Sequence, residues 1–418
     1  MANHFTVPTV RSYLAVLTIA IPGLALADTS YTGPSGGNWG DAANWNNGVP
    51  STSGWAEVKH GGTVVIDSST TATSASLYLG NDSTVNQTGG TYTTSGGFEF
   101  GIGDDGSGKS GTYNISGGVL SIGNSFLIVG NSAGATGNLN VTGTGVVNTN
   151  TSGLILGRDA TNSVGHLTVG GGGQVNANSI STFGGVGSGG TGTILLNTGG
   201  TLTVNQNIGQ NNGSLTLTFD GGTLKAGGSD GNFVQSGMTV VLGANGGIVD
   251  TNGFDTGIQS AVTGAGSLTK VGGDQLKLGG AISTYTGNTI VNAGVFTVEE
   301  SGGLTFDINA SGVNNKLTGN GTGNLNLFGS FTFDLSGAAA TGSWTIVDTA
   351  GFSGAANYGA NFSVTGFTQT SAGVWQSGNY TFDQSSGVLS AVPEPSTWVM
   401  ITCGLAGLMV FRRRLGRA

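Results

Sequence analysis

The chain has 418 residues, of which 82 are glycine and only 8% are charged. This glycine content is far above the usual share of about 7%, but there is no G-X-Y period and there are only six prolines, which excludes collagen. The low charge also argues against disorder driven by charge repulsion. Residues 28–392 hold 20 acidic and 7 basic side chains, a net charge of −13, which argues against binding to nucleic acid or to anionic lipid.

A secretory signal peptide is predicted at residues 1–27. Arg11 precedes the apolar run SYLAVLTIAIPGLALA, which ends in the small residues Ala25 and Ala27 around Leu26. A charged segment, an apolar segment and a small-residue site in this order are typical of an export signal. We expect signal peptidase to cleave after Ala27.

An internal repeat occupies residues 77–299. Pairs of one apolar residue and one glycine recur at Leu79-Gly80, Phe100-Gly101, Val129-Gly130, Leu156-Gly157, Phe183-Gly184 and Ile208-Gly209, with glycines 21, 29, 27, 27 and 25 residues apart. The segments between them, such as YNISGGVLSI, alternate apolar and polar residues around a glycine turn, which is typical of half-buried strands.

Units of this length bury an apolar face only by stacking on one another. We therefore predict an all-β fold, a right-handed parallel β-helix in which glycine allows positive φ at corners and asparagine ladders between coils. A β-propeller has blades of about 40 residues and fits these spacings poorly.

Residues 264–298 carry a more specific pattern, GAGSLTKVGGDQLKLGGAISTYTGNTIVNAGVFTV. This segment resembles the autotransporter-associated β-strand repeat through Leu268-Thr269-Lys270, Tyr285-Thr286-Gly287 and Asn292-Ala293-Gly294. Residues 28–76 include NWGDAANWNNGVPSTSGWAEV, which resembles the first coil of such passenger proteins and predicts an N-terminal capping coil closed by Trp39, Trp45 and Pro50. The resemblance implies an exported β-helix but no autotransport, because the last 120 or so residues lack the strand pattern of a membrane barrel.

A β-rich C-terminal cap is predicted at residues 300–391. Aromatic residues concentrate in strand-like segments such as FGSFTFDLSG and GSWTIVDTAG. A solenoid needs atypical terminal units to cover its open end, so we expect these aromatics to lie in the core. A row of exposed aromatics that binds carbohydrate is the alternative.

The last segment, residues 392–418, has three parts. VPEPSTW contains Pro393, Glu394 and Pro395, and residues 397–411 carry no charge before the cluster Arg412, Arg413 and Arg414. The prolines exclude a helix or a central strand at the motif. A helix over 397–411 would be about 22 Å long, somewhat short of the ~30 Å hydrocarbon core. We predict a short transmembrane helix there, with the arginines cytoplasmic under the positive-inside rule.

This order of motif, apolar stretch and arginines resembles the PEP-CTERM sorting signal. The resemblance implies processing by a membrane-embedded exosortase in a Gram-negative type of bacterium that makes extracellular polysaccharide. Pro393-Glu394-Pro395 would then be the recognition site. A rigid stalk before a permanent anchor is the alternative.

Motifs of catalysis and metal binding are not evident. His60 and His166 lie in unlike contexts, and neither HExxH, Cys/His metal spacing nor GxSxG is present. Polysaccharide-active β-helix enzymes use clustered carboxylates, whereas acidic residues are sparse here. Asp104-Asp105 in GIGDDGSG is a candidate for Ca²⁺, but the repeated pattern of calcium-binding β-rolls is missing, so a solvated turn is favoured. We predict no catalytic residue, no metal and no cofactor.

The sequence therefore predicts a non-enzymatic, exported structural or adhesive β-helix. We expect it to be held briefly in the inner membrane by its C-terminal helix and then placed on the cell surface or in the extracellular polysaccharide matrix. The predicted partners are signal peptidase, exosortase and, as a candidate, extracellular polysaccharide, with the membrane contacted only through the tail and no nucleic acid. A carbohydrate-binding module and a polysaccharide-active β-helix enzyme remain as alternatives.

Overall fold

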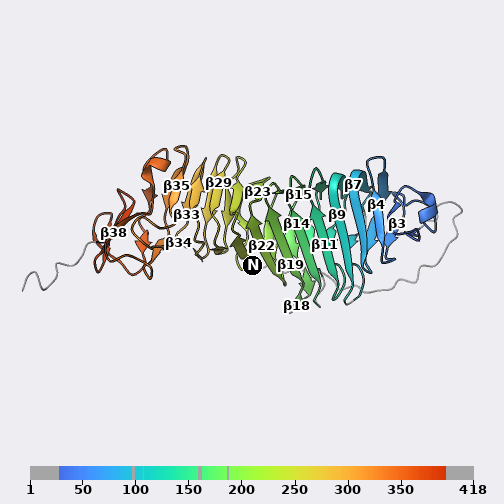
Figure 1. Ribbon diagram of the computed structural model, residues 1–418, viewed down its shortest axis with the longest axis horizontal. Coiled ribbons are helices and arrows are strands. Elements are labelled where there is room, and N and C mark those ends of the chain that lie inside the picture. The colour runs from blue at the N-terminus through green and yellow to red at the C-terminus, as the bar shows by residue number, and fades with distance from the viewer. Residues whose placement is uncertain (1–27, 97–98, 107, 159–161, 186–187, 392–418) are drawn as a thin grey trace, which may run out of the picture.

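The structure is a computed structural model that describes residues 28–391 except 97–98, 107, 159–161 and 186–187. It is a parallel β-solenoid of the right-handed type, and Figure 1 shows the coils stacked in chain order along one rod. The predicted fold class is thereby confirmed for this part of the chain. Within the described residues, the two helices are the short 3₁₀ turns η1 (Ala42–Asn44) and η2 (Thr349–Gly351).

The expected transmembrane helix at 397–411 lies outside the described residues. Across the part that is described, no helix is both long enough and apolar enough to cross a membrane.

One face of the rod is a single ladder of fourteen parallel strands, here called ladder A. In spatial order it consists of β1 (Thr29–Ser30), β3 (Trp55–Val58), β6 (Ser76–Leu79), β8 (Phe100–Ile102), β10 (Leu127–Val129), β13 (Leu154–Leu156), β16 (Ile180–Thr182), β21 (Ile208–Gln210), β24 (Asp230–Val234), β27 (Thr256–Ile258), β30 (Gln275–Leu278), β33 (Val295–Val298), β36 (Asn324–Leu327) and β39 (Asn357–Tyr358).

Two further parallel ladders line the other sides, and the twelve-residue strands β7 (Ser83–Thr94) and β9 (Ser110–Ser121) belong to both because they bend around a corner. The first also contains β2 (Gly37–Asn38), β4 (Thr63–Ile66), β11 (Thr136–Val141), β14 (Val164–Val169), β19 (Thr191–Asn197), β22 (Ser214–Asp220), β25 (Thr239–Leu242) and β28 (Val262–Gly264). The second also contains β5 (Thr71–Ser74), β12 (Val146–Asn148), β15 (Gln174–Ala177), β20 (Thr201–Val204), β23 (Thr223–Ala226), β26 (Gly247–Asp250), β29 (Leu268–Val271), β32 (Thr289–Val291) and β35 (Leu317–Gly319).

The core follows from the alternation along each strand. In β11, for example, residues 137, 139 and 141 are buried and those between them are half-buried. In ladder A the inward residues Val58, Leu79, Ile102, Val129 and Leu156 pair in register and are fully buried. Each coil thus stacks its apolar residues on those of the next, which gives one continuous core.

Asparagine ladders join the outer surfaces of neighbouring coils. The amide of Asn114 donates to Asn86 Oδ1 and that of Asn140 donates to Asn114 Oδ1, both at 2.8 Å, and Asn176 donates to Asn148 in the same way. These contacts confirm the predicted role of asparagine between coils.

The register of the repeat differs from the prediction at three of the six pairs, those of Phe100, Phe183 and Ile208. Ile208 pairs with Ile180, which pairs with Leu154, so Ile208-Gly209 lies two residues before the level of Leu156-Gly157. Val129-Gly130 pairs with Ile102-Gly103 rather than with Phe100-Gly101, while Gly101 lies beside Ile128. The sequence FEFGIG alternates apolar residues and glycine, so a shift of two residues keeps the same side chains inward. The repeat predicts Phe183 among the buried apolar residues, but its side chain is on the outside and 51% exposed.

Aromatic side chains close the N-terminal end. Trp39 packs against Trp45 at 4.8 Å between ring centroids and against Tyr92 at the same distance, and Trp45 Nε1 donates to the Trp39 carbonyl. Tyr31 packs edge-on against Trp45, and Pro50 is buried. These contacts keep solvent from the first coil of the core.

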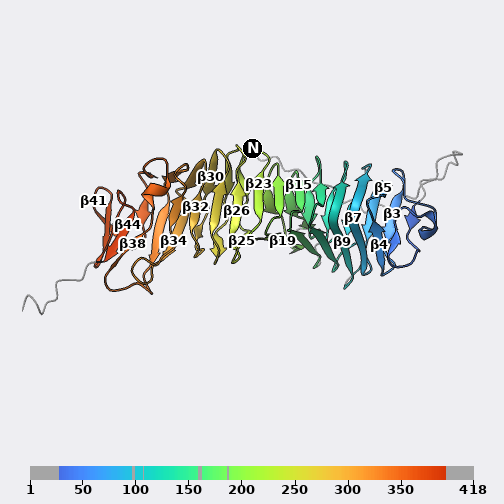
Figure 2. The same ribbon diagram turned by 45° about the horizontal axis from the view of Figure 1, so that its top comes forward.

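The C-terminal end changes from parallel to antiparallel pairing. Four parallel strands continue one side of the rod: β31 (Ile282–Ser283), β34 (Gly303–Asp307), β37 (Ser330–Asp334) and β40 (Ser363–Val364). A five-stranded antiparallel sheet covers the end, in the order β38 (Gly342–Thr345), β44 (Val388–Ala391), β43 (Tyr380–Asp383), β42 (Val374–Ser377) and β41 (Thr368–Ser371). Figure 2 shows this sheet across the end of the rod.

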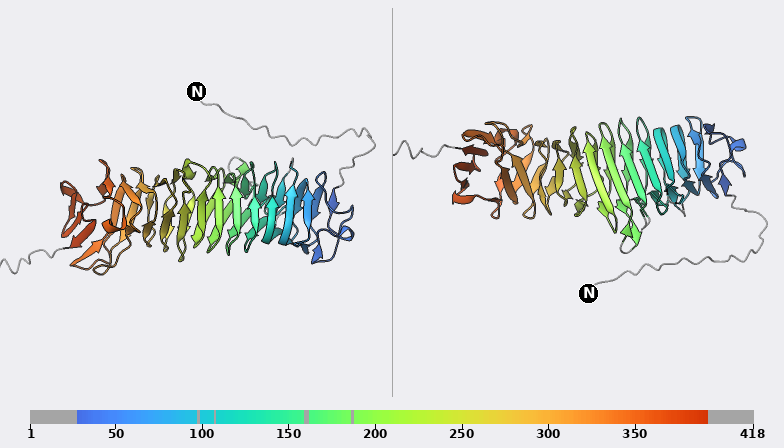
Figure 3. Two further views of the ribbon diagram at one scale, coloured as in Figure 1. Left: turned by 90° about the horizontal axis from the view of Figure 1, so that it is seen from above. Right: turned by 60° about the horizontal axis from the view of Figure 1, so that its bottom comes forward.

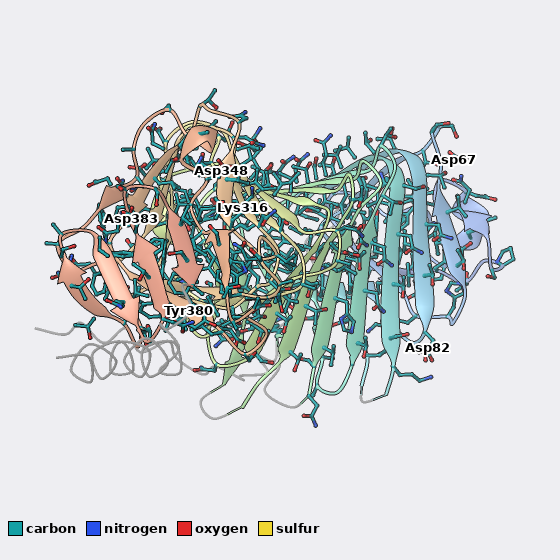
Figure 4. The ribbon with its side chains drawn as sticks, turned by 60° about the vertical axis from the view of Figure 1, so that its left-hand side comes forward. Asp67, Asp82, Lys316, Asp348, Tyr380 and Asp383 are labelled. Atoms are coloured by element: carbon teal, nitrogen blue, oxygen red, sulfur yellow. The ribbon has the colours of Figure 1, made fainter. Side chains whose placement is uncertain are left out.

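Most aromatic residues of this end lie in the core, as predicted, and Phe367, Trp375 and Tyr380 pack against it partly buried. Phe331, Trp344 and Phe382 are fully buried, and Phe331 packs edge-on against Phe306 and Phe362 at about 5 Å. Figure 4 looks from this end and shows Lys316 beside Asp348. Lys316 Nζ lies 3.5 Å from Asp348 Oδ2. The alternative of an exposed carbohydrate platform in this section is therefore wrong for these buried rings.

Candidate binding groove on the outer face of ladder A

A row of outward-facing residues crosses five strands of ladder A. Gly101, Ile128, Ile155, Ser181 and Gly209 occupy the same register position on β8, β10, β13, β16 and β21. Ile128 is only 1% exposed and Ile155 8% exposed, although both point away from the core. Other side chains must therefore cover these two isoleucines on the outside.

Two phenylalanines rise beside this row. Phe126 directly precedes β10 and Phe183 directly follows β16, and each ring is 51% exposed. Gly153 lies at the level of Phe126 on the next coil, since the Leu127 N–H donates to the Gly153 carbonyl. Gly153 carries no side chain here, and a Cβ at this position would lie only 2.9 Å from Ser179 Oγ.

These residues line a groove with a volume of about 290 Å³, which we call the ladder A groove. Ile128, Gly153 and Ile155 form its floor. Its remaining lining residues are Glu99, Phe126, Arg158, Ser179, Ser181 and Phe183. Because the floor is made of paired strands, the shape of the groove is set by the ladder itself. Figure 3 shows this stack of strands from two further sides, with the hairpin β17 (Gly184–Gly185) and β18 (Ser188–Gly189) projecting next to β16.

Arg158 holds the polar side of the groove. Its guanidinium forms an ion pair with Glu99 and donates to Asn131 Oδ1 at 3.0 Å. Glu99 precedes β8 and Arg158 follows β13, so the pair spans three coils across the groove. The charge of Arg158 is balanced, while part of its set of five N–H donors remains for a ligand.

A second charge cluster lies on the same face, next to the groove. Lys59 Nζ is 3.2 Å from Asp104, 3.6 Å from Asp105 and 3.5 Å from Glu57. Burial raises the pKa of Asp104, and the nearby Lys59 ammonium opposes that rise. Asp104 and Asp105, the disfavoured candidates for Ca²⁺, are thus engaged by an ammonium group. Within the described ranges, no group of three or more His, Cys, Asp or Glu residues is arranged to hold a metal ion.

A larger cleft of about 730 Å³ lies between η2 and the terminal sheet. Phe352, Tyr358, Val374 and Asp383 are among its lining residues. The Asp383 carboxylate accepts hydrogen bonds from the N–H and the hydroxyl of Ser385, both at 2.8 Å, which lowers its pKa. This carboxylate is therefore committed to its own turn.

The predicted processing residues cannot be placed in this architecture. Ala25 and Ala27, the motif Pro393-Glu394-Pro395 and the cluster Arg412, Arg413 and Arg414 all lie outside the described residues. The adjacent carboxylates Glu299 and Glu300 also serve contacts between coils, since Glu299 lies 3.8 Å from Lys277 and Glu300 accepts from Asn361.

Lys270, which carries the resemblance to the autotransporter-associated repeat, has a structural role. Its side chain is fully buried, and Nζ donates to Thr251 Oγ1 at 2.9 Å and to the carbonyls of Val271 and Gly272 at 3.1 and 2.9 Å. Burial lowers its pKa to about 8. The lysine of this motif therefore ties the turn carbonyls of its own coil to Thr251 of the coil before, and the Val271 carbonyl also accepts from the Thr251 N–H.

Sequence reasoning missed Phe126 and wrongly placed Phe183 among the inward-facing residues. Each stands one residue outside a three-residue strand, where alternation no longer indicates a face. An alignment of the coils by their outward residues would have found them, because Gly153 and Ser179 occupy the level of Phe126.

The rod of parallel coils with aromatic residues closing its ends fits a passenger-type β-helix. Residues 391–414 match the model of the PEP-CTERM protein-sorting motif. The chain thus carries this motif at its C-terminus.

The chain is similar to the "Adhesin BmaC autotransporter" of Brucella suis biovar 1 (strain 1330), with 35% identity over 133 residues. The aligned part is 32% of this chain and 4% of the adhesin's length. No solved structure matches this chain.

Proposed function

We propose that this protein is a non-enzymatic, exported adhesive rod that is sorted to the cell surface or the extracellular polysaccharide matrix. The match of residues 391–414 to the sorting motif carries this proposal, because that motif ends a chain whose described part is a β-solenoid. The limited similarity to an autotransporter adhesin supports an adhesive role.

Export depends on the predicted signals at the two ends of the chain. Signal peptidase removes residues 1–27, and exosortase acts at Pro393-Glu394-Pro395 while the apolar segment 397–411 and Arg412–Arg414 hold the chain in the inner membrane. The rod before residue 392 then reaches the cell surface or the extracellular polysaccharide matrix.

A non-enzymatic role is supported by the state of the carboxylates on ladder A. Glycoside hydrolysis uses two carboxyl groups about 5–10 Å apart, one acting as acid and the other as base or nucleophile. Here Glu99 is paired with Arg158, and Asp104 and Asp105 are paired with Lys59. Paired carboxylates favour binding and structure over proton transfer.

The test compares cells without this gene, cells that express the full chain, and cells that express the chain with Pro393, Glu394 and Pro395 replaced by alanine. We expect the full chain to restore surface labelling and attachment, and the alanine variant to remain with the membrane fraction. Surface labelling without any change in attachment would contradict the adhesive role.

A further inference from the structure

We infer that the ladder A groove binds a neutral sugar ring of a glycan chain. This inference rests on the proposed adhesive function and names the class of ligand that one surface of the rod takes. The observations that carry it are the two exposed phenylalanine rings, the recessed isoleucine floor and the neutralised Arg158–Glu99 pair within one groove.

The apolar part of the groove suits the C–H face of a pyranose. Phe126 and Phe183 each leave half of their surface exposed, although large apolar side chains are usually covered. Two such rings on either side of an apolar floor form a contiguous apolar site rather than scattered exposed residues. A sugar ring would stack its apolar face on an exposed phenylalanine ring, beside the largely covered Ile155.

The polar part of the groove suits hydroxyl groups. Arg158 retains N–H donors beyond those that contact Glu99 and Asn131, and the carboxylate of Glu99 has acceptor sites beyond its bond to Arg158. Ser179 and Ser181 also line the groove, Ser181 beside Ile155 on the next coil. Neighbouring sugar hydroxyls both donate and accept hydrogen bonds. Arg158 supplies donors, Glu99 supplies acceptors, and the serine hydroxyls can do either.

The local charge favours a neutral ligand over an acidic one. Glu57, Asp104, Asp105 and Glu99 outnumber Lys59 and Arg158 on this face. An acidic polymer would be repelled by this excess, while the balanced Arg158 offers no free positive charge to attract it. The small volume also suits one ring rather than a helix or strand of another protein, whose interfaces bury about 800 Å² on each partner.

The experiment is affinity gel electrophoresis of the protein recovered from the cell surface, with laminarin, hydroxyethyl cellulose, dextran or galactomannan in the gel. Alginate serves as the acidic polysaccharide. We expect at least one neutral polymer to retard the protein. Phe126→Ala and Phe183→Ala should each weaken that binding about tenfold, and Arg158→Gln should weaken it by a similar factor.

A matched control is Trp55→Ala, which removes another exposed aromatic ring of ladder A that does not line the groove. This variant should bind as the wild type does. Circular dichroism should show the same β content for every variant, because the replaced phenylalanines lie outside the core.

Three outcomes would overturn the inference. They are an absence of retardation by every neutral polymer, retardation that Phe126→Ala and Phe183→Ala leave unchanged, and stronger retardation by alginate than by any neutral polymer. Loss of binding to a protein partner in the two phenylalanine variants, without glycan binding by the wild type, would reassign the groove to that partner. If the protein is at the surface and mediates attachment but binds no neutral glycan, the groove inference fails and the proposed function stands.

Discussion

Gly103 provides a test of how closely the coils approach one another. It has φ of 76°, its N–H donates to the Leu79 carbonyl at 2.8 Å, and its carbonyl accepts from Asn131 and Ser132 of the next coil. A Cβ added there would lie 2.7 Å from backbone atoms of Thr136 and Gly137. Favourable contacts between carbon atoms need about 3.5–4.0 Å, so Gly103→Ala forces two coils apart.

The expected loss of stability has two parts. The left-handed conformation costs an alanine about 1–2 kcal/mol, and the overpacked contact adds about 1–3 kcal/mol. Gly103→Ala should therefore lower the free energy of unfolding by about 2–5 kcal/mol. Since a solenoid is stabilised by contacts between neighbouring coils, the loss should be local to β6, β8 and β10.

Two glycine controls separate these parts. Gly312 has φ of 79° with nothing within 4 Å of an added Cβ, so Gly312→Ala should lose only about 1–2 kcal/mol. Gly106 has neither a positive φ nor a close neighbour, so the free energy of unfolding of Gly106→Ala should stay within about 0.5 kcal/mol of the wild type. Denaturant unfolding measures the free energy of unfolding, and amide hydrogen exchange shows whether the loss is local to β6, β8 and β10. An equal loss for Gly103→Ala and Gly312→Ala would refute the close approach of the coils.

Three further predictions concern titration and the tail. Because burial lowers the pKa of Lys270 to about 8, the unfolded chain holds the proton more tightly, so stability rises with pH. Relative to Lys270→Met, the wild type should gain about 2 kcal/mol between pH 8 and 10 in denaturant titrations, and parallel curves would contradict this. Burial lowers the pKa of His60, whose ring nitrogens lack partners, so stability should fall as the pH drops below about 6.5, less steeply in His60→Phe. Replacing Arg412–Arg414 by glutamine should reduce processing of the tail on immunoblots, and normal processing would argue against their anchoring role.

The sequence predicted the solenoid because its repeats show both alternation and a recurring glycine. The same alternation could not settle the register at FEFGIG, since Phe100 and Ile102 both point inward and only pairing with Leu79 and Val129 tells them apart. The resemblance pointed to Lys270 as part of a repeat, but its bonds to Val271, Gly272 and Thr251 required the coil geometry.

The groove was not predictable from one coil at a time. Glu99, Phe126, Arg158 and Phe183 lie on four coils and are up to 84 positions apart in the sequence. Their proximity follows from the length of each coil, which places one coil directly above the previous one. Residues at strand ends have no periodic signal, so only the stacked structure brings them together.

The central claim is that the rod is exported and separated from its tail, and intact mass spectrometry tests it most directly. The protein would be taken from the membrane, cell-surface and medium fractions. Our account predicts a surface or medium form that begins at Asp28 and ends close to Pro393. A form that keeps Arg412–Arg414 and is found only in the inner membrane would contradict it.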